Sequence, residues 1–159
     1  MKNFKSGFTM VELIFVVVII GILASIAIPR FAATRDDAVV AKARNTIATV
    51  RNALAMERQK RILRGDFTPI TAVGGQTDVF GHFDNNSSLP LVLEYPIPNT
   101  PDTKDKWSFS QGSGKDGRDQ YIFKSSLGDV IFEVVNGKFE CNPSLTSNTN
   151  DKGCRQLTS

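Results

Sequence analysis

The sequence predicts an α+β protein in which one long N-terminal helix packs against a small antiparallel sheet. Residues 8–63 carry a continuous apolar run and then apolar residues at spacings of three and four, which is the period of a helix. After residue 105 the apolar spacing falls to two, which is typical of strands. Asn136 and Gly137 separate two such runs and favour a tight hairpin.

The first part of the helix is long and apolar enough to cross a membrane. Residues 8–28 would form about 30 Å of helix, the thickness of a bilayer core, and Glu12 is the charged residue among them. Lys2 and Lys5 precede this run, so the positive-inside rule predicts a cytoplasmic N-terminus. The small residues Ser6 and Gly7 also precede it, whereas an ordinary secretory signal has its cleavage site after the apolar core.

Glu12 is a candidate functional residue because of where it stands. A carboxylate at the centre of a bilayer costs roughly 2.5–3.5 kcal/mol, so an acid in a membrane segment indicates a function. The alternative is that Glu12 lies in the interfacial zone and marks the membrane boundary. The spacing of the residues leaves both interpretations open.

The stretch GFTMVEL (residues 7–13), followed by an apolar run and Ile28-Pro29, resembles the class III signal of type IV pilins and type II secretion pseudopilins. The resemblance covers about residues 1–35. It implies that a prepilin peptidase removes the leader, residues 1–7, after Gly7 and then methylates the new amino terminus at Phe8. It also implies that Glu12 pairs with the amino terminus of a neighbouring subunit, which neutralises a charge that is costly to bury alone.

The pilin-like pattern divides the chain into four parts. After the leader come a transmembrane and filament-core helix over 8–29, an amphipathic helix of the head over 30–65, and a globular β-sheet head over 66–159. Pro29 removes a backbone hydrogen bond and Gly21 weakens the helix. The resemblance implies that the segment from Gly21 to Pro29 is unwound in the filament, so both residues are expected helix breaks.

An apolar stripe after Pro29 predicts how the second half of the helix packs on the head. Its members recur at helical spacing and are Val39 or Val40, Ala43, Ile47, Val50 and Leu54. The basic residues are expected to lie largely elsewhere on the helix: Lys42, Arg44, Arg51, Arg58 and Arg61. Gly65 is the expected C-terminal cap.

The head begins with a long loop and ends in strands. Residues 66–105 are rich in turn formers and predict a loop, with one short helix or strand near Leu91–Tyr95. Strands are predicted over 107–109, 120–124, 129–135 and 138–141.

Charge is distributed unevenly along the chain. Residues 30–64 carry nine basic and three acidic residues, whereas residues 65–159 carry eight basic and twelve acidic residues. A basic helix could meet the phosphates of DNA, or it could complement the acidic heads of neighbouring subunits. The second interpretation is favoured, because a filament needs complementary subunit surfaces in any case.

Cys141 and Cys154 are the two cysteines of the chain. A translocated head lies in an oxidising compartment, where a disulfide is the expected state. The pair resembles the C-terminal disulfide loop of many pilins. Free thiols or metal ligands are the alternative, but the chain has one histidine and no second pair of cysteines.

Two further stretches each have a functional and a structural interpretation. Asp102, Asp105, Asp116 and Asp119 flank the predicted strand at Trp107 and loosely resemble the calcium loop of major pseudopilins. Aspartates in such loops are also common turn formers. Asn86 stands in an Asn-x-Ser glycosylation sequence, although turn composition explains that stretch equally well.

The sequence therefore predicts a structural protein and not an enzyme, since no catalytic constellation is recognisable. No cofactor is expected apart from the candidate calcium ion. The resemblance implies a single-pass protein of the bacterial inner membrane with its head in the periplasm. Prepilin peptidase, other pilin or pseudopilin subunits and an inner-membrane assembly platform are the implied partners.

The resemblance implies two functions for such a subunit. The first is assembly into a type II secretion pseudopilus. The alternative is a type IV pilus subunit for DNA uptake, adhesion or twitching motility, with DNA as a candidate partner. A membrane-anchored enzyme that carries the same signal is disfavoured by the missing catalytic residues.

Overall fold

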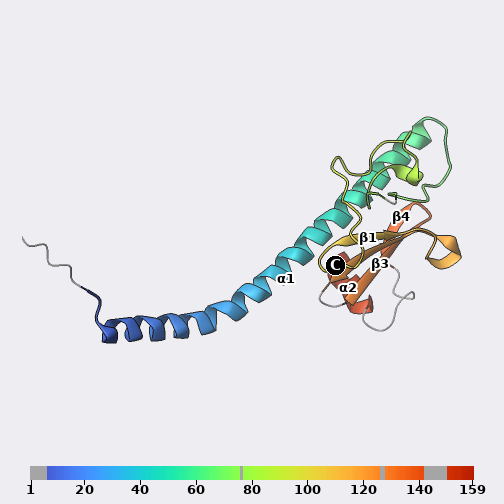
Figure 1. Ribbon diagram of the computed structural model, residues 1–159. Helices are drawn as coiled ribbons and strands as arrows, with labels where there is room; N and C mark the ends of the chain where they lie inside the picture. Colours follow the sequence, from blue (N-terminus) through green and yellow to red (C-terminus); the bar gives the residue numbers. More distant parts are fainter. Residues whose placement is uncertain (1–6, 76, 126–127, 142–149) are drawn as a thin grey trace, which may run out of the picture. The chain divides into compact units, whose positions relative to one another are not determined.

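The computed structural model describes residues 7–75, 77–125, 128–141 and 150–159 (Figure 1). Its elements in chain order are α1 (Met10–Leu63), η1 (Phe83–Asn85), β1 (Trp107–Ser110), η2 (Lys115–Gly117), β2 (Gln120–Ser125), β3 (Gly128–Val135), β4 (Lys138–Cys141) and α2 (Asn150–Thr158). The chain forms two compact units, Met1–Ala38 and Val39–Ser159, and α1 runs through the division between them. The long helix and the antiparallel sheet confirm the predicted α+β class.

The end of α1 is closed by Gly65, as predicted. The N–H of Gly65 donates to the carbonyl of Ile62 at 2.9 Å, and the N–H of Asp66 donates to the carbonyl of Arg61 at 2.9 Å. This pair of bonds is the Schellman motif, which requires a left-handed residue after the last turn. Gly65 supplies that conformation with φ +79°.

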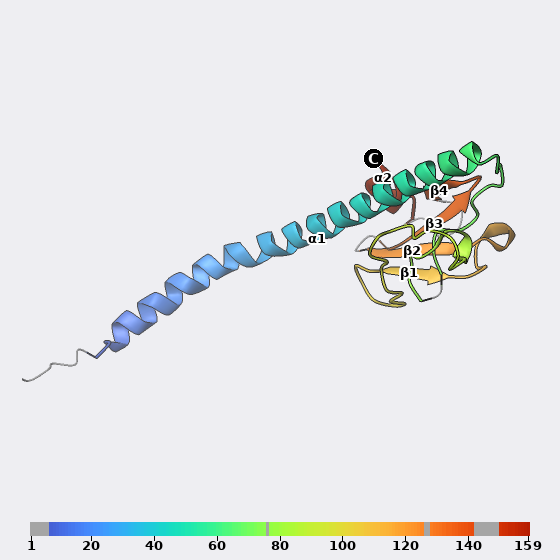
Figure 2. The ribbon, with the colours of Figure 1, turned by 90° about the horizontal axis from the view of Figure 1, so that it is seen from above.

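The four strands of the sheet follow one another in space in the order β1-β2-β3-β4, and each neighbouring pair is antiparallel. Figure 2 shows the sheet beside the C-terminal part of α1. Asn136 and Gly137 join β3 to β4 with φ values of 51° and 72°. Two successive left-handed residues define the type I′ hairpin that Asn-Gly favours.

The core of the unit Val39–Ser159 lies between the sheet and one face of α1. The predicted stripe is buried there, and Ala43, Ile47, Val50 and Leu54 are each at most 2% exposed. Fully burying a side chain of valine, leucine or isoleucine contributes about 1.5–3 kcal/mol. The facing side chains of the sheet are Trp107, Phe109, Tyr121, Phe123, Val130, Phe132, Val134 and Phe139.

The loop between α1 and β1 is held by aromatic packing and one buried hydrogen bond. The Phe80 ring lies 5.1 Å from that of Trp107 and 5.6 Å from that of Tyr121, measured between centroids. The Tyr121 hydroxyl accepts the Val73 N–H at 2.8 Å. The short helix of this loop lies at Phe83–Asn85 and not near residues 91–95, where Leu91 forms only a single β-bridge with His82.

Two features of the head differ from the sequence prediction. The C-terminal helix α2 was not predicted, and its residues Cys154 and Leu157 are buried in the core. Arg61 does not lie away from the stripe: it is 7% exposed and continues the buried face one turn beyond Glu57. Its guanidinium is buried because two carboxylates surround it, as described below.

We expect Gly65→Ala to lower the free energy of unfolding by about 1–2 kcal/mol, because a Cβ is strained at positive φ. Gly75→Ala is the matched control. A Cβ would meet nothing within 4 Å at either position, and Gly75 lacks the left-handed φ. Urea denaturation of both variants checks this expectation, and equal stabilities would contradict it.

Candidate functional site

The predicted processing site lies directly before the first turn of α1. Thr9 precedes the helix, and its hydroxyl accepts the Glu12 N–H at 3.3 Å. The Thr9 carbonyl accepts the Leu13 N–H at 3.1 Å. Thr9 and Glu12 thus have the spacing of a capping box, and a carboxylate is favourable at the positive end of a helix. Gly7 and Phe8 lie just outside the helix and are exposed, while residues 1–6 fall outside the described ranges.

The segment that follows is apolar on every side. Large hydrophobic residues from Leu13 to Ile28 are exposed around the whole helix, and the most apolar stretch of α1 has a mean hydropathy of 3.0 with none of it buried. By length and composition this helix could cross a membrane. A surface of this kind needs lipid or other apolar helices around it.

Gly21 and Pro29 both lie inside continuous α-helix. The unwinding expected between them concerns the assembled filament, so it stays a prediction.

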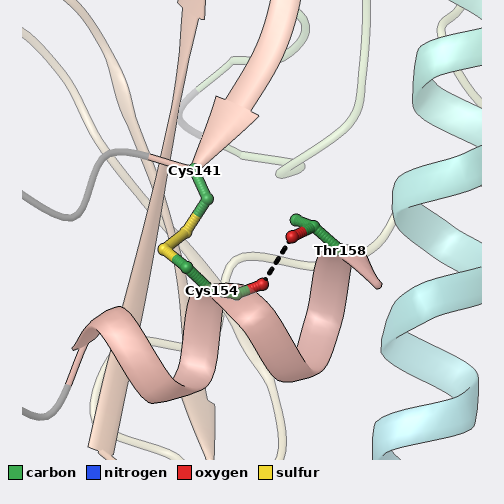
Figure 3. The surroundings of a disulfide bond; sticks show 3 residues. All are labelled: Cys141, Cys154 and Thr158. Carbon is green, nitrogen blue, oxygen red and sulfur yellow. Dashed lines mark hydrogen bonds between the residues drawn. A yellow bond between two sulfur atoms is a disulfide. The ribbon is translucent and has the colours of Figure 1, made fainter.

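Cys141 and Cys154 form the expected disulfide, with their Cα atoms 5.7 Å apart. Cys141 ends β4 and Cys154 lies in α2, so the bond ties the C-terminal helix to the edge of the sheet (Figure 3). The Thr158 hydroxyl donates to the Cys154 carbonyl at 2.7 Å within the same helix (Figure 3). Residues 142–149 of the predicted disulfide loop lie outside the described part of the chain.

The four aspartates of the candidate calcium site lie near opposite ends of the β1–β2 pair. Asp102 and Asp105 precede β1, and Asp102 pairs with Lys124 at 2.6 Å. Asp116 and Asp119 lie between β1 and β2. Asp116 pairs with Arg118 at 3.1 Å, and Asp119 accepts the Asn85 amide at 2.7 Å. Among the described residues, no group of three or more His, Cys, Asp or Glu residues is arranged to hold a metal ion.

Asn86, the candidate glycosylation residue, is exposed directly after η1. Its side-chain oxygen accepts the Ser88 N–H at 2.9 Å, which is the local turn bond typical of asparagine. The turn and the exposed side chain fit both sequence interpretations.

A charged cluster that was not predicted closes the buried face of α1. The Arg61 Nε donates to Glu57 at 3.2 Å, and an Arg61 Nη donates to Asp84 at 2.7 Å. Asp84 also accepts the N–H of Thr71 at 2.6 Å, so it connects the loop to the helix end. Glu57 and Arg61 extend the stripe at its own spacing, and that continuation is the sequence signal that could have revealed them.

The cluster favours its charged form. Burial alone would raise the pKa of Asp84, but hydrogen bonds from Thr71 and Arg61 outweigh it and the pKa is lowered. Burial alone would lower the pKa of Arg61, but its bonds to Asp84 and Glu57 raise it. The side chain of Asp84 is about a quarter exposed, at 24%, so solvent screens part of this interaction.

Comparison with known proteins matches the N-terminal segment. Residues 2–28 match the family of the prokaryotic N-terminal methylation motif. The type IV narrow pilus major component PilA5 of Thermus thermophilus is 52% identical over 50 residues, which are 31% of this chain and 43% of that protein. The type II secretion system core protein G of Aeromonas hydrophila is 42% identical over 55 residues, which are 35% of this chain and 38% of that protein.

The resemblance to pilins and pseudopilins is therefore confirmed for part of the chain. The matches span less than half the length of each of these relatives, at 43% and 38%. One relative belongs to a pilus and the other to a secretion system, and both are named as components of assemblies. No solved structure matches the chain.

We expect reduction of the disulfide to lower the free energy of unfolding by about 3 kcal/mol, the chain-entropy value for a loop of this length. Denaturation with and without a thiol reductant measures the effect. A variant with both Cys141→Ala and Cys154→Ala is the control, because the reductant should leave its midpoint unchanged. An unchanged midpoint in the reduced wild type would contradict the expectation.

We expect Asp84→Asn to lower the free energy of unfolding by about 1–3 kcal/mol at neutral pH, because Arg61 loses a charged partner. A carboxylate with a lowered pKa stabilises the fold above its unfolded pKa of about 3.9, and this contribution disappears as the pH falls through the folded value. The difference in unfolding free energy between the variant and the wild type should therefore shrink below about pH 4. Chemical denaturation from pH 7 to pH 2 measures it, with the exposed Glu94→Gln as control. A difference independent of pH would refute this account.

Proposed function

We propose that this chain is a structural subunit of a pilin-like filament, namely a type II secretion pseudopilus. The observation that carries the proposal is the first turn of α1, where Glu12 stands one turn from Phe8 at the start of an exposed apolar helix. The match of residues 2–28 to the methylation motif supports the same conclusion. Prepilin peptidase would cut between Gly7 and Phe8 and methylate the amino group of Phe8.

The energetics of the apolar segment support assembly as its purpose. Lipid covers the segment before assembly, and the corresponding helices of neighbouring subunits cover it afterwards. Glu12 would then lose its contact with water and would need a positive partner, since an unpaired buried charge is strongly unfavourable. The amino terminus at Phe8 of a neighbouring subunit supplies that charge, so correct stacking of the subunits is linked to charge neutralisation.

The proposal assigns a role to each part of the chain. Residues 1–7 are the leader, residues 8–29 the membrane and filament-core helix, residues 30–65 the helix of the head, and residues 66–159 the remaining head. The N-terminus lies in the cytoplasm and the head in the periplasm of the inner membrane. The disulfide of the head supports this orientation, because disulfides persist in oxidising compartments. The assembly platform of the inner membrane and other subunits are the partners.

A type IV pilus subunit is the second candidate function. The 52% identity to a pilus major component over 50 residues favours it. Isolating the filaments from native cells discriminates the two functions. A surface pilus that contains this chain favours the second candidate, and loss of secreted proteins on deletion without surface filaments favours the first.

We expect the intact mass of the protein from its native membrane to lack residues 1–7 and to carry one added methyl group. Gly7→Ala should leave the full-length mass, because the peptidase of this family cuts after a glycine. Glu12→Ala should be processed normally and should be absent from sheared or purified filaments. Thr9→Val is the control, since it removes the capping hydroxyl of the same turn and keeps the charge of Glu12.

Each outcome of this experiment decides part of the proposal. Wild-type protein of full length without a methyl group would mean that the N-terminal segment is only a membrane anchor. That result would overturn the proposal. A normal yield of filaments from the Glu12→Ala variant would show that filament assembly does not need the Glu12 carboxylate. Filaments lost equally with Thr9→Val would assign the defect to the helix start and not to the charge.

A further inference from the structure

The C-terminal helix α2 is too short to be stable without the rest of the head. It has 9 residues, Asn150–Thr158, whereas isolated helices shorter than about 12–15 residues are marginal in water. Gly153 lies within it, and glycine is the poorest helix former apart from proline. Among the described side chains of α2, those of Cys154 and Leu157 are buried in the core. The helix therefore depends on what holds it to its neighbours.

Three non-covalent contacts hold α2 against α1 and β3. The Leu157 side chain is 3% exposed and belongs to the core cluster. Gly153 packs so closely on Val130 of β3 that a Cβ at this position would collide with the Val130 side chain. The Nε of Arg44 in α1 donates to the carbonyl of Gln156 at 2.7 Å. A single large apolar side chain and one exposed hydrogen bond are a small set of contacts for ordering a whole segment.

The fourth contact of α2 is covalent. Cys154 lies near the middle of the helix, and its disulfide fixes that point to Cys141 at the end of β4, with the two Cα atoms 5.7 Å apart (Figure 3). Cys141 is half-buried, whereas Cys154 is 7% exposed. The Cys141 sulfur is thus the more accessible end of a bond that otherwise faces the core.

The rest of the head has a core that does not need α2. Among the described residues, Cys154 and Leu157 are the members of the core cluster that α2 supplies, and the others come from α1, the loop before β1 and the sheet. The contact between the apolar stripe of α1 and the aromatic face of the sheet involves neither of them. Loss of α2 therefore leaves the main layers of the head in contact, as expected for a segment that opens locally.

We propose that the disulfide is a redox latch for α2: the helix is docked only while Cys141 and Cys154 are oxidised, and reduction releases it from a head that stays folded. Release uncovers the side of Val130 that Gly153 covers and frees the Arg44 guanidinium from Gln156. Formation of the disulfide is therefore the step that completes this side of the head. The latch uses neither the leader nor Glu12, so it can fail or succeed independently of the proposed function.

A dithiol supplies the two electrons that open the latch. One of its thiolates attacks the Cys141 sulfur, the bond to Cys154 breaks, and Cys154 leaves as a thiolate that takes up a proton. The second thiol of the reagent then displaces Cys141 from the mixed disulfide, and Cys141 is protonated in turn. The chain gains two thiols, and the reagent is oxidised to a disulfide.

The test measures amide hydrogen exchange of the full-length chain in non-ionic detergent, peptide by peptide, before and after reduction with a dithiol. Amides of α2 should exchange about a hundredfold faster after reduction, which corresponds to the chain-entropy value for a loop of this length. Peptides from β2, β3 and the stripe of α1 should keep their rates. The variant with both Cys141→Ala and Cys154→Ala should match the reduced wild type without any reductant, which separates the effect of the bond from that of the reagent.

Leu157→Ala is the matched variant, because it removes the apolar anchor of α2 and keeps the disulfide. Its α2 amides should exchange more slowly in the oxidised state than those of the reduced wild type. Equal rates in these two samples would overturn the proposal and assign the docking of α2 to the burial of Leu157. Unchanged exchange of α2 on reduction would overturn it as well, and so would a simultaneous loss of protection in α1 and the sheet, which would show that the head unfolds as one unit.

Discussion

The burial of one face of α1 is the interaction on which the head depends. Ala43, Ile47, Val50 and Leu54 meet the aromatic face of the sheet, and this contact builds the core of the unit Val39–Ser159. The apolar face of a sheet must be buried against another element. The helix therefore serves as the second layer of the head, whereas the apolar side chains of its first half are exposed.

The same helix must satisfy two environments, and its sequence changes accordingly. Residues up to Ile28 are apolar around the whole circumference, which suits lipid or a bundle of helices. Beyond Val39 one apolar stripe is buried and most of the polar residues lie on the exposed side, which suits one packed face and water. The polar end of the stripe, Glu57 and Arg61, is buried with its charges paired, because Arg61 binds both Glu57 and Asp84.

The charges of the head divide into those that hold the fold and those that face outward. Arg61 and Lys124 are paired within the chain, and both bind loops to regular elements. Arg44 and Arg51 form no ion pair among the described residues, and each donates from Nε to a main-chain carbonyl, of Gln156 and Phe139 respectively. These two exposed arginines therefore tie α1 to α2 and β4.

Local rules determined much of this protein from its sequence. The apolar run, the stripe, the Gly65 cap and the Asn136-Gly137 hairpin each depend on residues close in the chain, and the first turn with Gly7, Phe8 and Glu12 is recognisable for the same reason. Tertiary structure decided the rest. α2 has few apolar residues and is held by the disulfide and by Leu157 in the core. Arg61 is buried because Asp84, in a loop distant in sequence, pairs with it. The four aspartates lie near both ends of the β1–β2 pair. Those arrangements depend on which segments meet in space, because burial and pairing between distant residues have no local pattern.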